Sequence, residues 1–122
     1  MDEMPVSQRP VRSLRVLLDP PNPSLALLLG LQPDIEVVAS AMARPAVALT
    51  ESVERVPELL ADDPECRILV LTGSAHPGLA RAVAAAGGAG LVLRDGPVED
   101  LAESVRRASR GESVTDPALD AP

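Results

Sequence analysis

Three polar residues stand where apolar segments of this chain end, and their side chains have complementary chemistry. Asp19 follows the apolar run that begins at Leu14, Thr72 follows the run that begins at Ile68, and Arg94 follows a third run. If these runs are parallel strands, their carboxyl ends meet at one edge of a sheet, which is where open α/β sheets bind ligands. A carboxylate, a hydroxyl and a guanidinium would then line one crevice suited to a small molecule.

The second half of the chain gives the clearer signals for the elements that would hold these residues. Residues 68–71 are four consecutive aliphatic residues, typical of a strand buried on both faces. A helix is expected over residues 77–86, and a second strand over residues 90–93. The last helix, residues 97–110, has acids in its first turn, arginines in its last turn and Gly111 as its stop.

The first half predicts a similar alternation in shorter form. Residues 14–18 are a strand candidate, and Asn22 is a good N-cap for a short apolar helix that has Pro23 at its first position. Residues 34–39 then read as a second strand. This alternation predicts a single α/β domain with a mainly parallel sheet and helices on both faces.

Residues 42–66 allow two interpretations. Residues 46–50 form either a third strand, followed by a short helix at residues 52–61, or the start of one longer helix. Pro57 would interrupt the longer helix, because proline removes a backbone donor and crowds the preceding turn. We therefore favour strand and then short helix.

Composition excludes several classes of function. The 122 residues contain no Phe, Trp, Tyr or Lys and carry a net charge of −7. Without aromatic platforms or a basic face, direct binding of nucleic acid by this chain is not expected. Cys66 and His76 are single, so neither a disulfide nor a structural metal site is expected. No segment has the length of a membrane span or a secretory signal, and we expect a cytoplasmic protein.

The ordered set of elements resembles the receiver domain of bacterial two-component response regulators, specifically the NarL/FixJ type. The resemblance is closest at residues 35–38, 68–72 and 86–111. There, Ala-Gly-Gly-Ala-Gly-Leu-Val-Leu-Arg-Asp-Gly-Pro looks like the family's penultimate loop, final strand and start of the final helix. It implies a flavodoxin- or CheY-like receiver fold with a shortened first half.

The resemblance also implies boundaries for the domain. The receiver-like part would span residues 14–112, after a flexible N-terminal arm at residues 1–13. Residues 113–122 form a C-terminal tail that resembles the family's interdomain linker. A helix-turn-helix DNA-binding domain commonly follows in that family, and this sequence contains none.

In that family an acidic pair after the first strand holds Mg²⁺, and an Asp that ends the third strand accepts a phosphoryl group. A Thr or Ser ends the fourth strand and a Lys ends the fifth. A cation and an ammonium group neutralise the charge of the transferred phosphoryl group. Here the resemblance puts Thr72 at the position of the Thr or Ser and Arg94 at the position of the Lys. Arginine keeps the positive charge, but its guanidinium is a broad, planar group, whereas the lysine ammonium is a compact point charge.

The family's acidic residues are largely replaced. The acidic pair falls on Pro20 and Pro21, so that only Asp19 remains of the acidic pocket. If residues 45–50 are the third strand, Glu51 takes the phosphoacceptor position. Proline has no side-chain ligand for Mg²⁺, and one carboxylate is a poor site for this strongly hydrated ion. We therefore expect no cofactor, and Mg²⁺ binding that is lost or weak.

These departures predict an atypical receiver that is not an enzyme. It would regulate signalling or transcription by homodimerising or by docking a protein partner through the last strand and helix, without conventional aspartyl phosphorylation. One alternative is a working phosphoacceptor that uses Asp19 and a second acid, Asp95 or Glu51. The other alternative is a small-molecule-binding α/β regulatory domain.

Overall fold

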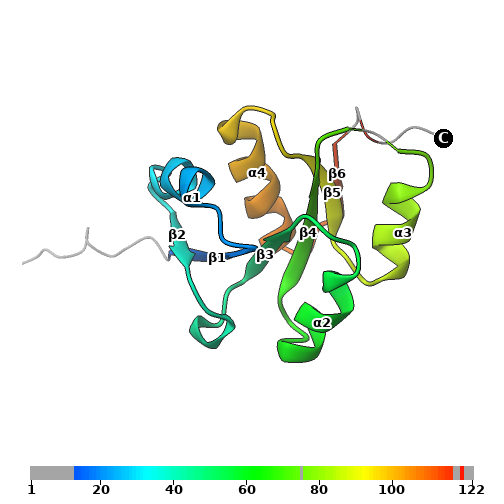
Figure 1. Ribbon diagram of the computed structural model, residues 1–122. Coiled ribbons are helices and arrows are strands. Elements are labelled where there is room, and N and C mark those ends of the chain that lie inside the picture. Colours follow the sequence, from blue (N-terminus) through cyan, green and yellow to red (C-terminus); the bar gives the residue numbers. More distant parts are fainter. Residues whose placement is uncertain (1–12, 75, 117–118, 120–122) are drawn as a thin grey trace, which may run out of the picture.

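The computed structural model describes residues 13–74, 76–116 and 119, and it has the α/β architecture that the sequence predicts. Its six strands are all parallel and lie in the order β2-β1-β3-β4-β5-β6 (Figure 1). The elements are β1 (Leu14–Asp19), α1 (Pro23–Gly30), β2 (Ile35–Val38), the 3₁₀ turn η2 (Ala41–Ala43), β3 (Val47–Thr50), α2 (Arg55–Asp62), β4 (Arg67–Thr72), α3 (Leu79–Ala85), β5 (Gly90–Leu93), α4 (Val98–Ser109) and β6 (Val114–Thr115).

Helices cover both faces of the sheet, as expected. Helices α1 and α4 lie on one face, and α2 and α3 lie on the other (Figure 1). Alternate residues of each strand point to opposite faces, so that Val16 and Leu18 join the cluster under α1 and α4, whereas Leu17 joins the cluster under α2 and α3. Because the chain has no aromatic residue, both clusters consist of aliphatic side chains, with Cys66 added in the cluster under α2 and α3.

The interpretation of residues 46–61 as strand and then helix is confirmed, and the alternative of one long helix is wrong. All four residues of β3 are buried, which fits a central strand covered on both faces. Pro57 is the third residue of α2, within the first turn, where its missing N–H is not needed.

The first half is shortened between β2 and β3, where residues 39–46 contain no helix other than the three-residue turn η2. Asn22 caps α1 as predicted, because its Oδ1 accepts a hydrogen bond of 3.1 Å from the backbone N–H of Leu25. Helix α1 is apolar on most sides, and Leu27 and Leu31 are 68% and 72% exposed.

Strand β6 was not predicted from the sequence, which assigned residues 113–122 to a tail. Val114 and Thr115 pair with Gly90 and Leu91 in a parallel register. The ordered sheet therefore extends past the predicted domain end at Glu112.

Arg106 of α4 holds the loop between α1 and β2. Its Nε and Nη2 donate to the two carboxylate oxygens of Asp34 at 2.8 and 2.9 Å, and Nη2 also donates to Oε1 of Gln32 at 2.9 Å. Hydrogen bonding from Arg106 lowers the pKa of the Asp34 carboxyl below its ordinary value of 3.8. The clamp links the end of α1 to α4.

Replacing this guanidinium, as Arg106→Met, is expected to lower the free energy of unfolding at pH 7 by about 1 kcal/mol. The pKa of Asp34 is depressed in the folded state, so this stabilisation is complete above the unfolded pKa and is lost as the pH falls through the folded pKa. Urea unfolding of both chains at pH 7, 5, 4 and 3 should therefore show a difference that shrinks below about pH 4. A difference that stays constant down to pH 3 would contradict the ion pair as its source.

Cys66 is buried directly before β4, and burial raises the pKa of its thiol to about 11. Because the thiolate is the reactive form, the folded chain is expected to react with a thiol reagent at pH 8 at least ~100-fold more slowly than the urea-unfolded chain. Rapid labelling of the folded chain would show that this edge of the core opens readily.

Among the described residues, no helix has both the length and the apolar character that crossing a bilayer requires.

Candidate functional site

The candidate residues of the sequence analysis lie at the carboxyl ends of four neighbouring strands. Asp19 ends β1 and Thr72 ends β4, while Glu51 and Arg94 directly follow β3 and β5. The register places Asp19 beside Thr50, the residue before Glu51, and places Thr72 beside Leu93, the residue before Arg94. Since all these strands are parallel, the four residues share one edge of the sheet.

Asp19 forms an ion pair with an arginine of helix α2. The Nε of Arg55, in the first turn of α2, donates to Oδ2 of Asp19 at 2.7 Å, and Arg55 also pairs with Glu58. The Asp19 side chain is 25% exposed, so the pair is partly shielded from water. Hydrogen bonding to Asp19 raises the pKa of Arg55 above its ordinary value. One carboxylate oxygen of Asp19 is therefore already hydrogen-bonded to Arg55.

Glu51 and Arg94 form the second ion pair of this edge. The Nη1 of Arg94 lies 3.4 Å from Oε1 of Glu51, and both side chains are more than a third exposed. To reach Glu51 from β5, the arginine crosses the end of β4, which lies between β3 and β5. The guanidinium passes close over Gly73, where a Cβ would lie 2.6 Å from Nη2 of Arg94, so that a larger residue at this position would require the arginine to shift. The guanidinium also lies 3.8 Å from a carboxylate oxygen of Asp95.

Thr72 takes part in a local turn and not in the Glu51–Arg94 pair. Its Oγ1 donates to the carbonyl oxygen of Ser74 at 2.9 Å. Its own carbonyl accepts a hydrogen bond of 2.8 Å from the backbone N–H of Arg94. This main-chain contact fixes the start of the loop after β5 relative to the end of β4.

Two residues of this edge were missed by the sequence analysis. Arg55 lies 36 residues from Asp19 in the sequence, and no local pattern links them. Gly73 was noted only as the residue that follows a strand, although its missing Cβ leaves the room that Arg94 occupies. The first contact becomes visible only when α2 is placed beside the end of β1, and the second only when the ends of β4 and β5 are placed side by side.

Each acid at this edge is thus matched by an arginine, and Pro20 and Pro21 offer no side-chain oxygen. In the described part of the chain, no group of three or more His, Cys, Asp or Glu side chains is placed to hold a metal ion.

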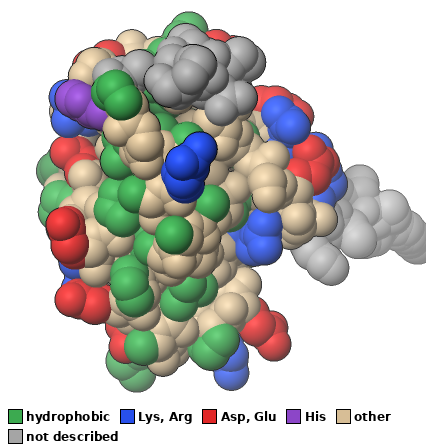
Figure 2. Space-filling model, turned by 90° about the vertical axis from the view of Figure 1, so that its right-hand side faces the viewer, with side chains coloured by type: hydrophobic (Ala, Val, Ile, Leu, Met, Phe, Trp, Pro, Cys, Tyr) green, Lys and Arg blue, Asp and Glu red, His purple; other side chains and the backbone are tan. Residues whose placement is uncertain are grey.

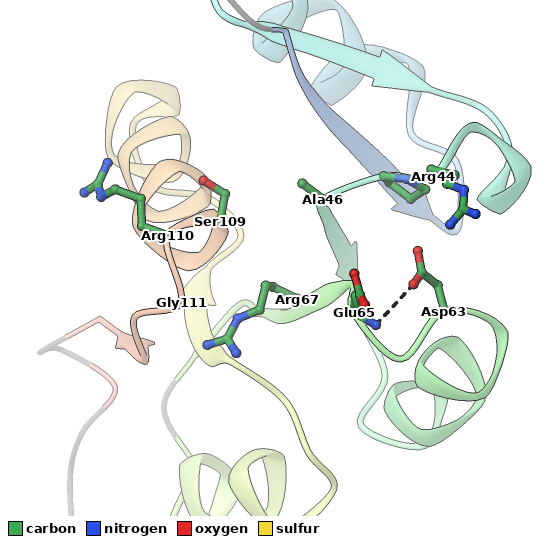
Figure 3. Close-up of a pocket in the computed structure, with 9 residues that line it drawn as sticks. Arg44, Ala46, Asp63, Glu65, Arg67, Ser109, Arg110 and Gly111 are labelled. Carbon is green, nitrogen blue, oxygen red and sulfur yellow. Dashed lines mark hydrogen bonds between the residues drawn. The ribbon is translucent and has the colours of Figure 1, made fainter.

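A separate cavity of about 460 Å³ lies at the opposite end of the sheet. Its lining includes Ala46, just before β3, and Arg67, at the start of β4, together with the end of α4. Figure 3 shows the Arg44 and Arg67 side chains pointing in different directions, with Glu65 between them. They do not converge on one point as the arginines of an anion site would.

Comparisons with known proteins agree with this architecture. No family model matches the chain. The transcriptional regulatory protein DesR of Bacillus subtilis is 30% identical over 114 residues, and the alignment covers 79% of this chain and 56% of DesR. The uncharacterized transcriptional regulatory protein YvfU, also of Bacillus subtilis, is 30% identical over 96 residues, covering 79% of this chain and 46% of YvfU. The chain spans about half the length of these relatives.

Solved structures give the same fold. A two-component response regulator of the LuxR family from Aurantimonas superposes with a TM-score of 0.75 at 19% identity, covering 88% of this chain and 92% of that one. The signal receiver domain of the putative response regulator NarL from Mycobacterium tuberculosis gives 0.72 at 18% identity, covering 84% of this chain and all of that one.

Proposed function

Since the fold of this chain is that of a response-regulator receiver domain, we propose that it is an atypical receiver that acts without aspartyl phosphorylation. It regulates signalling or transcription through contacts with proteins. The observation that carries the proposal is the pairing of the two candidate pocket acids at the carboxyl edge, Asp19 with Arg55 and Glu51 with Arg94.

The side chains beside Asp19 support a site that does not use Mg²⁺, because they offer few oxygen ligands. The ion requires near-octahedral oxygen ligands and gives up its water reluctantly, so it needs carboxylates that are free to bind it. Asp19 would have to leave Arg55, and the two prolines that follow it have no oxygen on their side chains. We therefore propose that neither Mg²⁺ nor another cofactor is part of the working state.

Glu51 supports a charge-based substitute for phosphorylation. A glutamate carries its charge one methylene farther out than an aspartate, and here this charge meets Arg94. We assign the Glu51–Arg94 pair the role of a permanent link between the ends of β3 and β5 across Gly73. Thr72 supports that link through its carbonyl, which accepts the Arg94 N–H.

The partner in this account is a protein, either a second copy or another regulator, bound through β5 and α4. Helix α4 exposes Glu99, Asp100, Glu103 and Arg107 to solvent, a mixed-charge surface suited to selective docking. The curated relatives are transcriptional regulatory proteins, which supports a regulatory role, and we place that role in the cytoplasm. The chain itself makes no direct contact with nucleic acid or membrane in this account.

The proposal is tested by offering the chain a phosphoryl group. The purified protein is incubated with excess Mg²⁺ and a small-molecule phosphoryl donor, then measured by intact mass, beside a receiver that keeps its aspartate acceptor. The account expects the added mass of one phosphoryl group on the control and none on this chain. Stoichiometric modification of Asp19 or Glu51 by a phosphoryl group would overturn it.

A further inference from the structure

Arg55 binds two carboxylates that belong to different elements. Its Nε donates at 2.7 Å to Oδ2 of Asp19, at the end of β1, and its Nη1 donates to Oε1 of Glu58, one turn later in α2. Arginine suits this position, because its guanidinium is always charged in proteins and is more weakly hydrated than an ammonium group. One guanidinium therefore supplies the positive charge that both acids face.

The backbone before Arg55 is fixed to the end of β3. Thr50 is fully buried at this end, and its Oγ1 accepts a hydrogen bond of 3.4 Å from the N–H of Ser52. The carbonyl of Ser52 then accepts a hydrogen bond of 3.1 Å from the N–H of Arg55. The Arg55 side chain therefore starts from a fixed point and joins the segment after β3 to the end of β1.

Asp19 depends on this one positive charge. Among the described residues, Arg55 is the only cation within ion-pair distance of the Asp19 carboxylate. The Asp19 side chain is only 25% exposed, and a charge that is partly withdrawn from water interacts more strongly with a neighbouring charge than an exposed one does. Without the guanidinium, the Asp19 carboxylate would be partly buried and uncompensated.

We propose that Arg55 is a built-in cation, which takes the place of a divalent metal ion at Asp19 and ties the end of β1 to the segment after β3. A divalent ion at this edge would need the Asp19 carboxylate, which the guanidinium already holds. A guanidinium is part of the chain and cannot dissociate as a bound ion does, so this link does not depend on the metal concentration. The inference rests on the proposed function, because it specifies what replaces Mg²⁺ there.

Removing the guanidinium tests this role. Arg55→Met and Arg55→Gln replace it with uncharged side chains, so that Asp19 and Glu58 lose their cation, whereas Arg55→Lys keeps the positive charge. Mn²⁺ is the probe, because it favours the same oxygen ligands as Mg²⁺ and its unpaired electrons broaden the NMR signals of nearby backbone amides. The broadening locates the bound ion even when its affinity is low.

Arg81→Met is the matched control for the change in net charge. Arg81 is exposed on α3 and forms no ion pair with another residue in the part of the chain that the structure describes. Figure 2 looks onto the side of the molecule that carries α3, where charged side chains are few. This variant therefore makes the chain more negative by the same amount as Arg55→Met without freeing a carboxylate.

Arg55→Met and Arg55→Gln are expected to bind Mn²⁺ at least ~10-fold more tightly than the unmodified chain, because two carboxylates become free to act as ligands. The broadening should centre on the amides of Asp19 and Glu58. It should disappear in the double variant Asp19→Asn/Arg55→Met. Arg55→Lys and Arg81→Met should bind no more tightly than the unmodified chain.

Uncharged variants that keep a folded amide spectrum but gain no Mn²⁺ binding at Asp19 would overturn the inference. An equal gain in Arg55→Lys or Arg81→Met would also overturn it, since the charge at position 55 would then not be what excludes the ion. Two uncharged replacements are used so that the test does not depend on the folding of one variant. No phosphoryl donor is present, so failure here would remove only the role of Arg55, whereas phosphorylation of the unmodified chain would remove the proposed function.

Discussion

A variant that carries Pro20→Asp, Pro21→Asp and Glu51→Asp is expected to bind Mg²⁺ saturably at roughly millimolar concentration, whereas the unmodified chain is expected not to bind it. The substitutions place new carboxylates beside Asp19 and shorten the side chain that reaches Arg94. A cluster of carboxylates raises the local affinity for a hard cation, because charge and oxygen ligands are supplied together. Chemical shifts of backbone amides near residue 20 and residue 51 during a Mg²⁺ titration measure the binding.

The matched control carries Asn in place of all three new aspartates. It has nearly the same shape without the charges, so it should not bind Mg²⁺ in this range. Binding by the amide variant would show that the observed shifts do not report carboxylate ligation. If the acidic variant also fails to bind Mg²⁺, the absence of acids at positions 20 and 21 is not what prevents binding. The explanation that Pro20 and Pro21 abolish the site would then be wrong.

A second large effect is expected in the aliphatic core. Leu69 of β4 is fully buried, and Leu69→Ala is expected to lower the free energy of unfolding by about 2–5 kcal/mol, from the lost burial and the cavity left behind. This is a large share of the 5–15 kcal/mol that stabilises typical domains, so part of the population should be unfolded at 37 °C. Urea unfolding followed by far-ultraviolet circular dichroism measures it without aromatic probes.

Leu27→Ala is the control for this prediction, because Leu27 is 68% exposed on α1. Its effect is expected to lie within about 0.5 kcal/mol, as for other surface positions. Equal losses for the two variants would mean that Leu27 is covered in solution, for example by a second copy of the chain.

The elements that were predicted well are those in which several local signals agree. Helix α4 has acids in its first turn, arginines in its last and Gly111 after it, and the structure places the helix at Val98–Ser109. Strand β3 was harder, because a fully buried strand has no alternation that separates it from a buried helix. Strand β6 could not be recognised from the sequence, because two residues are too few to show a hydrophobic repeat. Their pairing also depends on Gly90, more than twenty residues earlier in the chain.

The candidate site was predictable in its position and less so in its contacts. Asp19, Thr72 and Arg94 follow from the rule that parallel strands bring their carboxyl ends to one edge, whereas Glu51 came from the family resemblance. Which arginine meets which acid does not follow from that rule. The partner of Asp19 comes from α2, and Arg94 reaches past β4 over Gly73, where a Cβ would lie close to its guanidinium.

The most direct test of phosphate-independent regulation is an amide NMR titration of the unmodified chain with Mg²⁺ and beryllofluoride, a mimic of the bound phosphoryl group. The account predicts a folded spectrum with no saturable shifts at Asp19, Glu51, Thr72 or Arg94. Saturable shifts at these four residues would show that a working phosphorylation pocket survives and would contradict the account.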